Sequence, residues 1–257
     1  MFVHFLEKIG MTVLGSLEKI GQVVLLTAET IKELRHMPRW RHVLEQMSHL
    51  GVDTLPIVAL TLLFTGMVMT LQLAHEFIRY GAQSTIGGVI TIAIGRELGP
   101  VLVGVVAAGR VGAAITAEIS TMKVTEQIDA LRVMATNPVN YLAVPRMLAC
   151  MIMVPLLTVF GDVIGVAGGW GIAVWYADLS SFVYTNSIDI FVSSHDITGG
   201  LIKAAFFGAV IAVLGCYHGL HAPAGAEGVG KATTRSVVSS IIVIFVLNCF
   251  LSLILYR

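Results

Sequence analysis

Five long apolar stretches dominate the pattern of hydrophobic and polar residues along this chain. They lie at about 55–73, 86–119, 147–175, 201–217 and 237–256. The first, Leu55 to Leu73, has 19 residues without a charge, close to the roughly 20 that a helix needs to cross a bilayer. The pattern predicts an all-α integral membrane protein with five transmembrane helices.

The second stretch, Ile86 to Ile119, has 34 residues and is too long for one straight crossing. The sequence RELGP at 96–100 divides it, and Pro100 predicts a kink or a break because it removes a backbone donor. Small residues recur at four-residue spacing in the second and third stretches, which allows close helix contact. They are Gly104, Ala108, Gly112, Gly161, Gly165 and Gly169.

The residues before about Leu50 are amphipathic rather than spanning. The sequence LEKIG occurs at 6–10 and again at 17–21, and this offset of 11 residues, about three helical turns, returns to nearly the same face. The pattern favours an N-terminal amphipathic helix lying in the membrane interface. A helix packed on the other spans is the alternative.

A second short helical segment is expected from Arg39, and Asp53 and Thr54 are candidate N-caps for the first span. Pro56 suits the first turn of that span. We therefore expect an interfacial region at 1–52 and a single five-span domain at 53–257.

A short polar helix is predicted at about 122–137, between the second and third spans. Thr125 can cap it, and Glu126 suits the positive end of its first turn. Its apolar stripe has the spacing of one helix face, with Val124, Ile128, Leu131 and Ala135 on it.

Basic residues predict the orientation, because cytoplasmic loops carry an excess of lysine and arginine. Eleven such residues lie on one side when the N-terminus is cytoplasmic, against Arg79 and Arg257 on the other. The eleven are Lys8, Lys19, Lys32, Arg35, Arg39, Arg41, Lys123, Arg132, Arg146, Lys231 and Arg235. The segment 122–137 is then cytoplasmic and the C-terminus is outside.

Composition agrees with a membrane protein: 56% of the residues are hydrophobic, 12% are charged and the mean hydropathy is +0.86. The zero net charge implies no bulk attraction to nucleic acid. Cys150, Cys216 and Cys249 lie in apolar runs, and neither they nor the eight histidines have ligand spacing. We expect no metal site, no catalytic residue and no cofactor.

Charged residues inside the apolar stretches are the candidate functional groups, since such residues usually face a cavity or a partner. Glu97 could line the polar part of a substrate cavity or form a salt bridge between spans. For Arg96, Arg110 and Glu118 the salt bridge is favoured. The apolar remainder of a cavity would come from the first span and its far end, although core packing would look similar; the candidates are Met69, Leu73, Phe77 and Tyr80.

Two further motifs are weak. The segment 225–232 nearly matches a phosphate-binding loop, but Ala232 lacks the hydroxyl that would bind magnesium and no strand precedes it, so its glycines are interpreted as a tight turn within a loop at 218–235. Asp162 in the third span has no second carboxylate for protease chemistry, which favours a structural or hydrogen-bonded role.

Several motifs together resemble the MlaE-type permease subunit of lipid-transporting ABC systems. The resemblance covers nearly the whole chain from about Leu50. The motifs are RELGP at 96–100, AGRVG at 108–112, TAE at 116–118, TEQIDAL at 125–131, NP at 137–138 and GKATT at 230–234.

The resemblance implies a homodimeric transmembrane permease in a bacterial inner membrane, working with a cytoplasmic ABC ATPase and a periplasmic MCE-domain protein. Such a system moves phospholipid between the inner and outer membranes and serves outer membrane lipid asymmetry, while ATP and magnesium bind the ATPase partner. The helix at 125–131 would be the coupling helix in the ATPase groove, with Thr125, Glu126, Ile128, Asp129 and Leu131 as contacts. Glu97 and the first span would border the lipid pocket.

A secondary transporter, an enzyme and a membrane scaffold are the alternative functions for this sequence. A secondary transporter would need broken helices at matching positions in two halves, and an enzyme would need a nucleophile with a base or a carboxylate pair. Neither pattern is present in the sequence. A non-transporting membrane scaffold for the ATPase and the periplasmic lipid-binding protein is the alternative that stays open.

Overall fold

The computed structural model describes residues 2–34 and 40–257, without the side chains of 2–9, 12, 13 and 16. These residues are mostly helical and contain no strand. Five helical segments within them are long and apolar enough to cross a membrane: Trp40–Arg79, Gln83–Val124, Val139–Trp175, Ser194–Leu220 and Ala226–Leu255. The predicted all-α fold with five spans is confirmed.

The first span begins earlier than expected. Helix α2 (Trp40–Gly51), the short η1 (Val52–Thr54) and α3 (Leu55–Arg79) form one continuous helical run, while the expected helix start at Arg39 lies outside the described residues. Pro56 does lie in the first turn of α3, but the predicted capping by Thr54 is wrong. Its hydroxyl instead donates to the carbonyl oxygen of Leu50 at 2.6 Å, the back-bonding that helix-interior threonines use.

The second span is one continuous helix whose hydrogen bonding changes locally from the α to the π pattern. Helices α4 (Ile86–Ala93), α5 (Gly99–Ala107) and α6 (Ala113–Val124) are joined by two π-helical turns, η3 (Ile94–Leu98) and η4 (Ala108–Gly112). Of the kink or break predicted at RELGP, the break is absent, because the helix continues through the π turn η3 with Pro100 in the first turn of α5. The short η2 (Gln83–Thr85) precedes α4.

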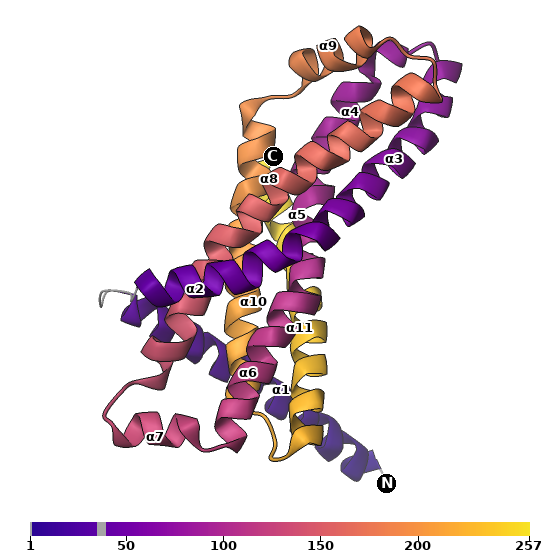
Figure 1. Ribbon diagram of the computed structural model, residues 1–257. Coiled ribbons are helices and arrows are strands. Elements are labelled where there is room, and N and C mark those ends of the chain that lie inside the picture. Colours follow the sequence, from indigo (N-terminus) through magenta and orange to yellow (C-terminus); the bar gives the residue numbers. More distant parts are fainter. Residues whose placement is uncertain (1, 35–39) are drawn as a thin grey trace.

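The third span, α8 (Val144–Trp175), runs the length of the bundle against α3 and α10 (Figure 1). A Cβ placed at Gly66 of α3 would collide with the carbonyl of Gly165 of α8, and one at Gly169 would lie 2.7 Å from the hydroxyl oxygen of Thr70. In the second span, a Cβ at Gly112 would lie 3.3 Å from Ile211 of α10. The predicted close packing at small residues is confirmed here.

The last two spans are also longer than predicted. Helix α10 (Ser194–Leu220) begins with a capping box between Ser193 and Asp196, and α11 (Ala226–Leu255) already includes most of the glycine-rich segment. The interpretation of 218–235 as a loop is therefore wrong. Only residues 221–225 separate the two helices, and a helix with no preceding strand offers no phosphate-binding loop.

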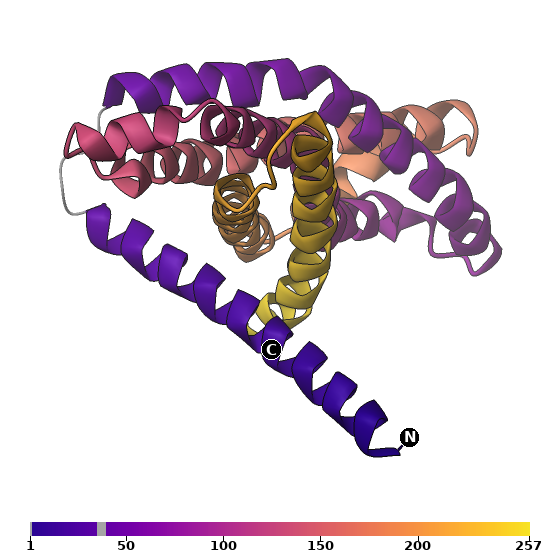
Figure 2. The same cartoon turned by 90° about the horizontal axis from the view of Figure 1, so that it is seen from below.

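Two short helices mark opposite ends of the bundle: α7 (Gln127–Val133) and α9 (Ser181–Phe191) (Figure 1). The π-helical η5 (Val139–Ala143) leads from α7 into α8. Helix α1 (Phe2–Glu33) crosses the bundle near the α7 end, and its N-terminal part extends beyond the other helices (Figure 2). Its described surface exposes several large apolar residues, including Leu17, Ile20 and Leu25.

Candidate functional site

An ionic cluster lies inside the spans, where η3 meets α10 and α11. Nζ of Lys203 lies 2.7 Å from Oε1 of Glu97, and Asn248 donates to Oε2 of the same carboxylate at 2.9 Å. The hydroxyl of Ser252 lies within 2.8 Å of both Nζ and Oε1. Three helices are thus joined by one carboxylate and one ammonium group.

The proline of the second span explains why a lysine is needed here. In an α-helix the N–H of residue 100 would donate to the carbonyl of Arg96, and Pro100 has no such donor. Nζ of Lys203 donates to this carbonyl oxygen at 2.9 Å. Because Lys203 is fully buried, its three donors are used on protein acceptors, as burial of an ammonium group requires.

A second ion pair lies beside the first. Nε and Nη2 of Arg96 both lie 2.6 Å from Oδ1 of Asp196, whose other oxygen accepts the backbone N–H of Ser193 at 2.8 Å. The salt bridge expected for Arg96 is thus present, with a partner that lies 100 residues along the chain.

Tyr256 covers the two pairs. Its ring centroid lies 4.8 Å from the Arg96 guanidinium carbon and 4.9 Å from the Lys203 ammonium nitrogen, distances at which cations are attracted to an aromatic face. Its hydroxyl donates to the carbonyl oxygen of Asp196 at 3.2 Å.

The two pairs share an asymmetry in exposure. The side chains of Lys203 and Asp196 are 0% and 2% exposed, whereas those of Glu97 and Arg96 are 40% and 38% exposed. A cavity of about 340 Å³ lined by Ser252, Leu253, Tyr256 and Arg257 adjoins the cluster. The arrangement presents one carboxylate and one guanidinium group on the surface of the spans, each held in place by a buried counter-charge.

The first-span candidates lie elsewhere in the chain. Leu73 and Phe77 are half-buried and pack against the apolar core, Met69 is half-buried, and Tyr80 is 78% exposed. The hydrogen-bonded partners of Glu97 are on α10 and α11, and none is on α3. A single chain does not bring Glu97 and these four residues into one described cavity.

Arg110 and Glu118 connect helices further along the second span. Nη1 of Arg110 donates to the hydroxyl of Thr54 at 2.7 Å, and Nη2 lies 3.5 Å from the carboxylate of Asp53. Glu118 lies 2.8 Å from Nη2 of the buried Arg146 on α8. Both contacts join the second span to a neighbouring helix.

For Asp162 a structural or hydrogen-bonded role was predicted, and the hydrogen bond is absent at its Oδ1 atom. Its Oδ1 atom is buried, and none of the described residues is its hydrogen-bond partner. The atom lies against Gly99, where an added Cβ would collide with it. The structure offers no physical account of this unpaired oxygen.

The predicted coupling segment forms a shorter helix than the expected 122–137. Helix α7 begins after Glu126, which has the left-handed φ of 61°, and no side chain caps it. The hydroxyl of Thr125 donates instead to the carbonyl oxygen of Thr121 at 2.9 Å, so the predicted cap is wrong. Asp129 is exposed and lies 3.0 Å from Arg132 on the same helix.

The apolar stripe predicted for this segment is only partly buried. Ile128 is only 3% exposed and Leu131 is half-buried against the core, whereas Val124 and Ala135 are exposed. Val133 and Met134, outside the stripe, are more exposed still, with 87% and 65% of their surface accessible. Sequence periodicity identified the stripe, but it does not distinguish a stripe that faces the chain's own spans from one that faces a partner.

Five helices able to span a membrane, paired charges within them and a short amphipathic helix at one end define a multi-pass membrane protein. The sequence profile of the family Permease MlaE matches residues 43–254. The chain therefore belongs to the MlaE permease family, as its motifs indicated.

Relatives place the family among ABC transporter permeases. The chain is 46% identical over 217 residues to a probable ABC transporter permease protein of Synechocystis, covering 84% of this chain and 82% of the relative. It is 43% identical over 215 residues to one of Rickettsia felis, covering 84% and 83%. It is also 40% identical over 229 residues to the chloroplastic protein trigalactosyldiacylglycerol 1 of Arabidopsis thaliana, covering 86% and 63%.

Proposed function

We propose that this chain is the permease subunit of an ABC system that moves phospholipid between the inner and outer membranes. In this proposal it carries no catalytic residue, and a separate ATPase subunit binds ATP and magnesium. The Arabidopsis relative is named after a glycerolipid, and this name supports a lipid as the cargo.

The observation that carries the proposal is the ion pair between the partly exposed Glu97 and the buried Lys203. A charged group at membrane depth is costly and marks a pathway or a polar ligand. Exposed apolar residues neighbour its α11 partners Asn248 and Ser252 in the sequence, including Phe250 and Leu253. An amphiphile could place its polar part at Glu97 and its chains along this apolar face.

A second copy of the chain would complete such a site. Helix α11 is the least buried of the five described spans, so a large part of its surface is free to meet lipid or another protomer. In a homodimer, the first-span residues Met69, Leu73, Phe77 and Tyr80 of one protomer would supply apolar walls that Glu97 lacks in the single chain.

The proposed orientation places the N-terminus and α7 in the cytoplasm of a bacterial inner membrane and α9 in the periplasm. The ATPase then docks at the α7 end, and an MCE-domain protein at the α9 end receives or delivers lipid. ATP binding would push on α7, and the closely packed glycines of the spans would transmit the movement.

Lipid transfer tests the proposal directly. The complex, reconstituted in vesicles with its ATPase and MCE-domain partners, should move fluorescent phospholipid to acceptor vesicles only with ATP. Glu97→Gln should lower the transfer rate about tenfold, the loss expected when about 1.4 kcal/mol of a charged hydrogen bond is removed. A scaffold would show no ATP-dependent transfer in either protein, and that result would reject the transport function.

Docking at α7 has its own test. Val133→Asp introduces a charge on an exposed apolar side chain and should abolish copurification of the ATPase while the chain stays folded. Ala224→Asp is the matched control, since residue 224 is exposed in the loop that contacts α6 through Lys123 and Ala222. Retention of the ATPase by the Val133 variant would contradict docking at this helix.

A further inference from the structure

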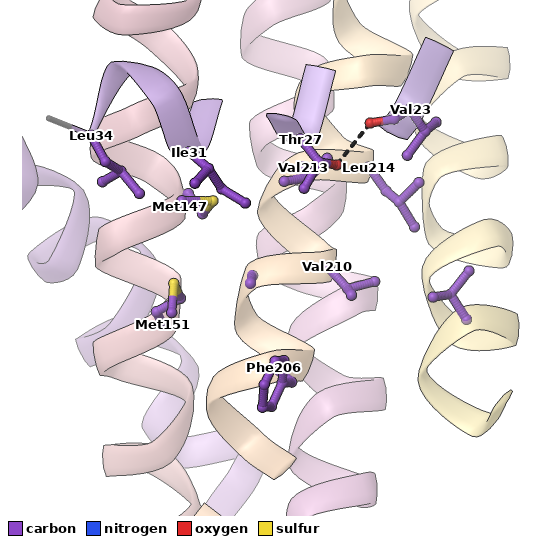
Figure 3. A pocket seen from close by; sticks show the side chains of 12 residues that line it. Val23, Thr27, Ile31, Leu34, Met147, Met151, Phe206, Val210, Val213 and Leu214 are labelled. Atoms are coloured by element: carbon purple, nitrogen blue, oxygen red, sulfur yellow. Dashed lines mark hydrogen bonds between the residues drawn. The ribbon is translucent and has the colours of Figure 1, made fainter. Parts of the chain in front are cut away.

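Helix α1 lies over an apolar cavity of about 380 Å³ that it shares with α8, α10 and α11. Figure 3 shows Val23, Thr27 and Ile31 of α1 on one side of this space and Met151 and Val210 of the spans on the other. The hydroxyl of Thr27, the one polar side chain of the lining, donates to the carbonyl oxygen of Val23 at 2.7 Å. The cavity thus offers no free hydrogen-bonding side chain.

Polar contacts hold α1 on both sides of the cavity. Toward its N-terminus, the hydroxyl of Tyr217 donates to Oε1 of Gln22 at 2.9 Å. Toward its C-terminus, Nδ2 of Asn140 donates to Oε2 of Glu33 at 2.7 Å. The helix is therefore fixed at two points. Val23, Leu26 and Leu34 of α1 contact the apolar core, and the cavity is the space that these contacts leave between α1 and the spans.

The chemistry of the cavity selects its occupant. Water needs two to four polar partners in such a site, which this almost entirely apolar lining does not provide. The lining residues of α10 run from Phe206 to Leu214, about 12 Å along the helix axis. This length is close to one leaflet, about half of the ~30 Å hydrocarbon core.

Basic residues gather one helical turn beyond the cavity. His218 follows Leu214 by four residues on α10, and its Nε2 atom lies 3.2 Å from the hydroxyl oxygen of Ser239, which follows Arg235 by four residues on α11. Lys19 of α1 precedes Gln22, the partner of Tyr217, by three residues. The acidic Glu18 beside it accepts from Gln22 at 3.4 Å. An apolar slot of leaflet length with lysine and arginine at its end matches an acyl chain with a phosphate headgroup.

We propose that the cavity under α1 binds one phospholipid, with an acyl chain in the slot and the phosphate near Lys19 and Arg235. The site shares no residue with the cluster around Glu97, and it does not depend on transport. The bound lipid fills the space between α1 and the spans. It thereby sets the position of α1, whose Glu33 is hydrogen-bonded to Asn140 of η5, the turn that follows α7.

Filling the slot tests the proposal. The full-length chain would be extracted from its own membranes in mild detergent, and retained phospholipids counted by native mass spectrometry. Val210→Trp should lose one phospholipid per chain relative to the unchanged protein, and Val213→Phe should do the same if the first variant folds poorly. Ile242→Trp is the control and should lose no phospholipid, because Ile242 is 57% exposed on α11.

Thermal unfolding gives a second readout. Added phosphatidylglycerol should raise the Tm of the unchanged protein and of the Ile242 control, since a ligand that binds only the folded state stabilises it. The Val210 variant should show a smaller rise. Equal lipid retention and equal Tm rises in all three proteins would overturn the proposal.

The headgroup and the source of the occupant are tested separately. Arg235→Gln should reduce phospholipid retention several-fold, and unchanged retention would overturn the assignment of the phosphate. A second copy of the chain is the competing occupant. Val210→Cys would then crosslink to α1 or α11 of another protomer, and Val210→Trp would retain all its phospholipid. Those two results together would assign the cavity to an interface between copies and reject the lipid site.

Discussion

Replacing Lys203 by methionine should destabilise the chain far more than replacing an exposed lysine. Lys203→Met removes an ammonium group that is fully buried and hydrogen-bonds to the Arg96 carbonyl, the Glu97 carboxylate and the Ser252 hydroxyl. Removing one partner of a buried ion pair costs about 3–5 kcal/mol. Glu97 keeps its hydrogen bond to Asn248 and is 40% exposed, so we expect the lower end, about 3 kcal/mol.

Two variants separate the contributions to that loss. Lys203→Met combined with Glu97→Gln removes the uncompensated charge but still leaves the carbonyl of Arg96 unpaired, which costs about 1–3 kcal/mol. The double variant should therefore recover about 1–2 kcal/mol relative to Lys203→Met alone. Lys231→Met is the matched control, because this lysine is 60% exposed and pairs only with Glu227 one turn away, an interaction of about 0.3–0.5 kcal/mol.

The assay is the free energy of unfolding of the full-length chain, from reversible titration with sodium dodecyl sulfate in mixed micelles. The ordering expected is Lys203→Met, then the double variant, then Lys231→Met, from least to most stable. If Lys203→Met lost no more stability than Lys231→Met, the role assigned to Lys203 in satisfying the Pro100 turn would be refuted.

Two further predictions follow from the backbone. Gly66→Ala should destabilise the chain by about 1–3 kcal/mol because the new methyl group meets the backbone of Gly165. Gly171→Ala is the control and should be neutral or slightly stabilising, since the space around Gly171 is open. Equal melting temperatures for the two variants would contradict the close approach of α3 and α8. Glu126→Gly should stabilise the chain by about 0.5–1 kcal/mol by relieving a left-handed φ of 61°, while Asp129→Gly in the interior of α7 should cost a similar amount. A loss of stability in the Glu126 variant would show that its side chain has another role.

The five spans were predictable from the sequence, but several of their ends were not, because polar residues continue the helices well beyond the apolar stretches. Helix α11 begins at Ala226, eleven residues before the hydropathy rises, because the glycine-rich segment has enough neighbouring helix to pack against. The continuity of the second span at Pro100 was missed for a related reason. A π turn and the donor supplied by Lys203 replace what the proline removes.

The candidate site was predictable in part. Arg96 and Glu97 were identifiable because a charge in an apolar stretch is conspicuous, while their partners were not singled out. Lys203 is the single charge in the apolar stretch at 201–217, and nothing local pairs it with a residue 106 positions earlier. Its position within an apolar stretch was the signal that could have found it.

The sequence by itself determined which segments are apolar enough to enter a bilayer, which charges enter with them, and that an amphipathic helix lies between the second and third spans. These properties depend on residues within one or two helical turns of each other, so periodicity and composition are sufficient to find them. The tertiary structure decided which charges pair, that Ile128 faces the chain's own core, and that α1 stands over a cavity. Those features depend on the rotation and spacing of packed helices, because a difference of one helix face separates a buried contact from an exposed one.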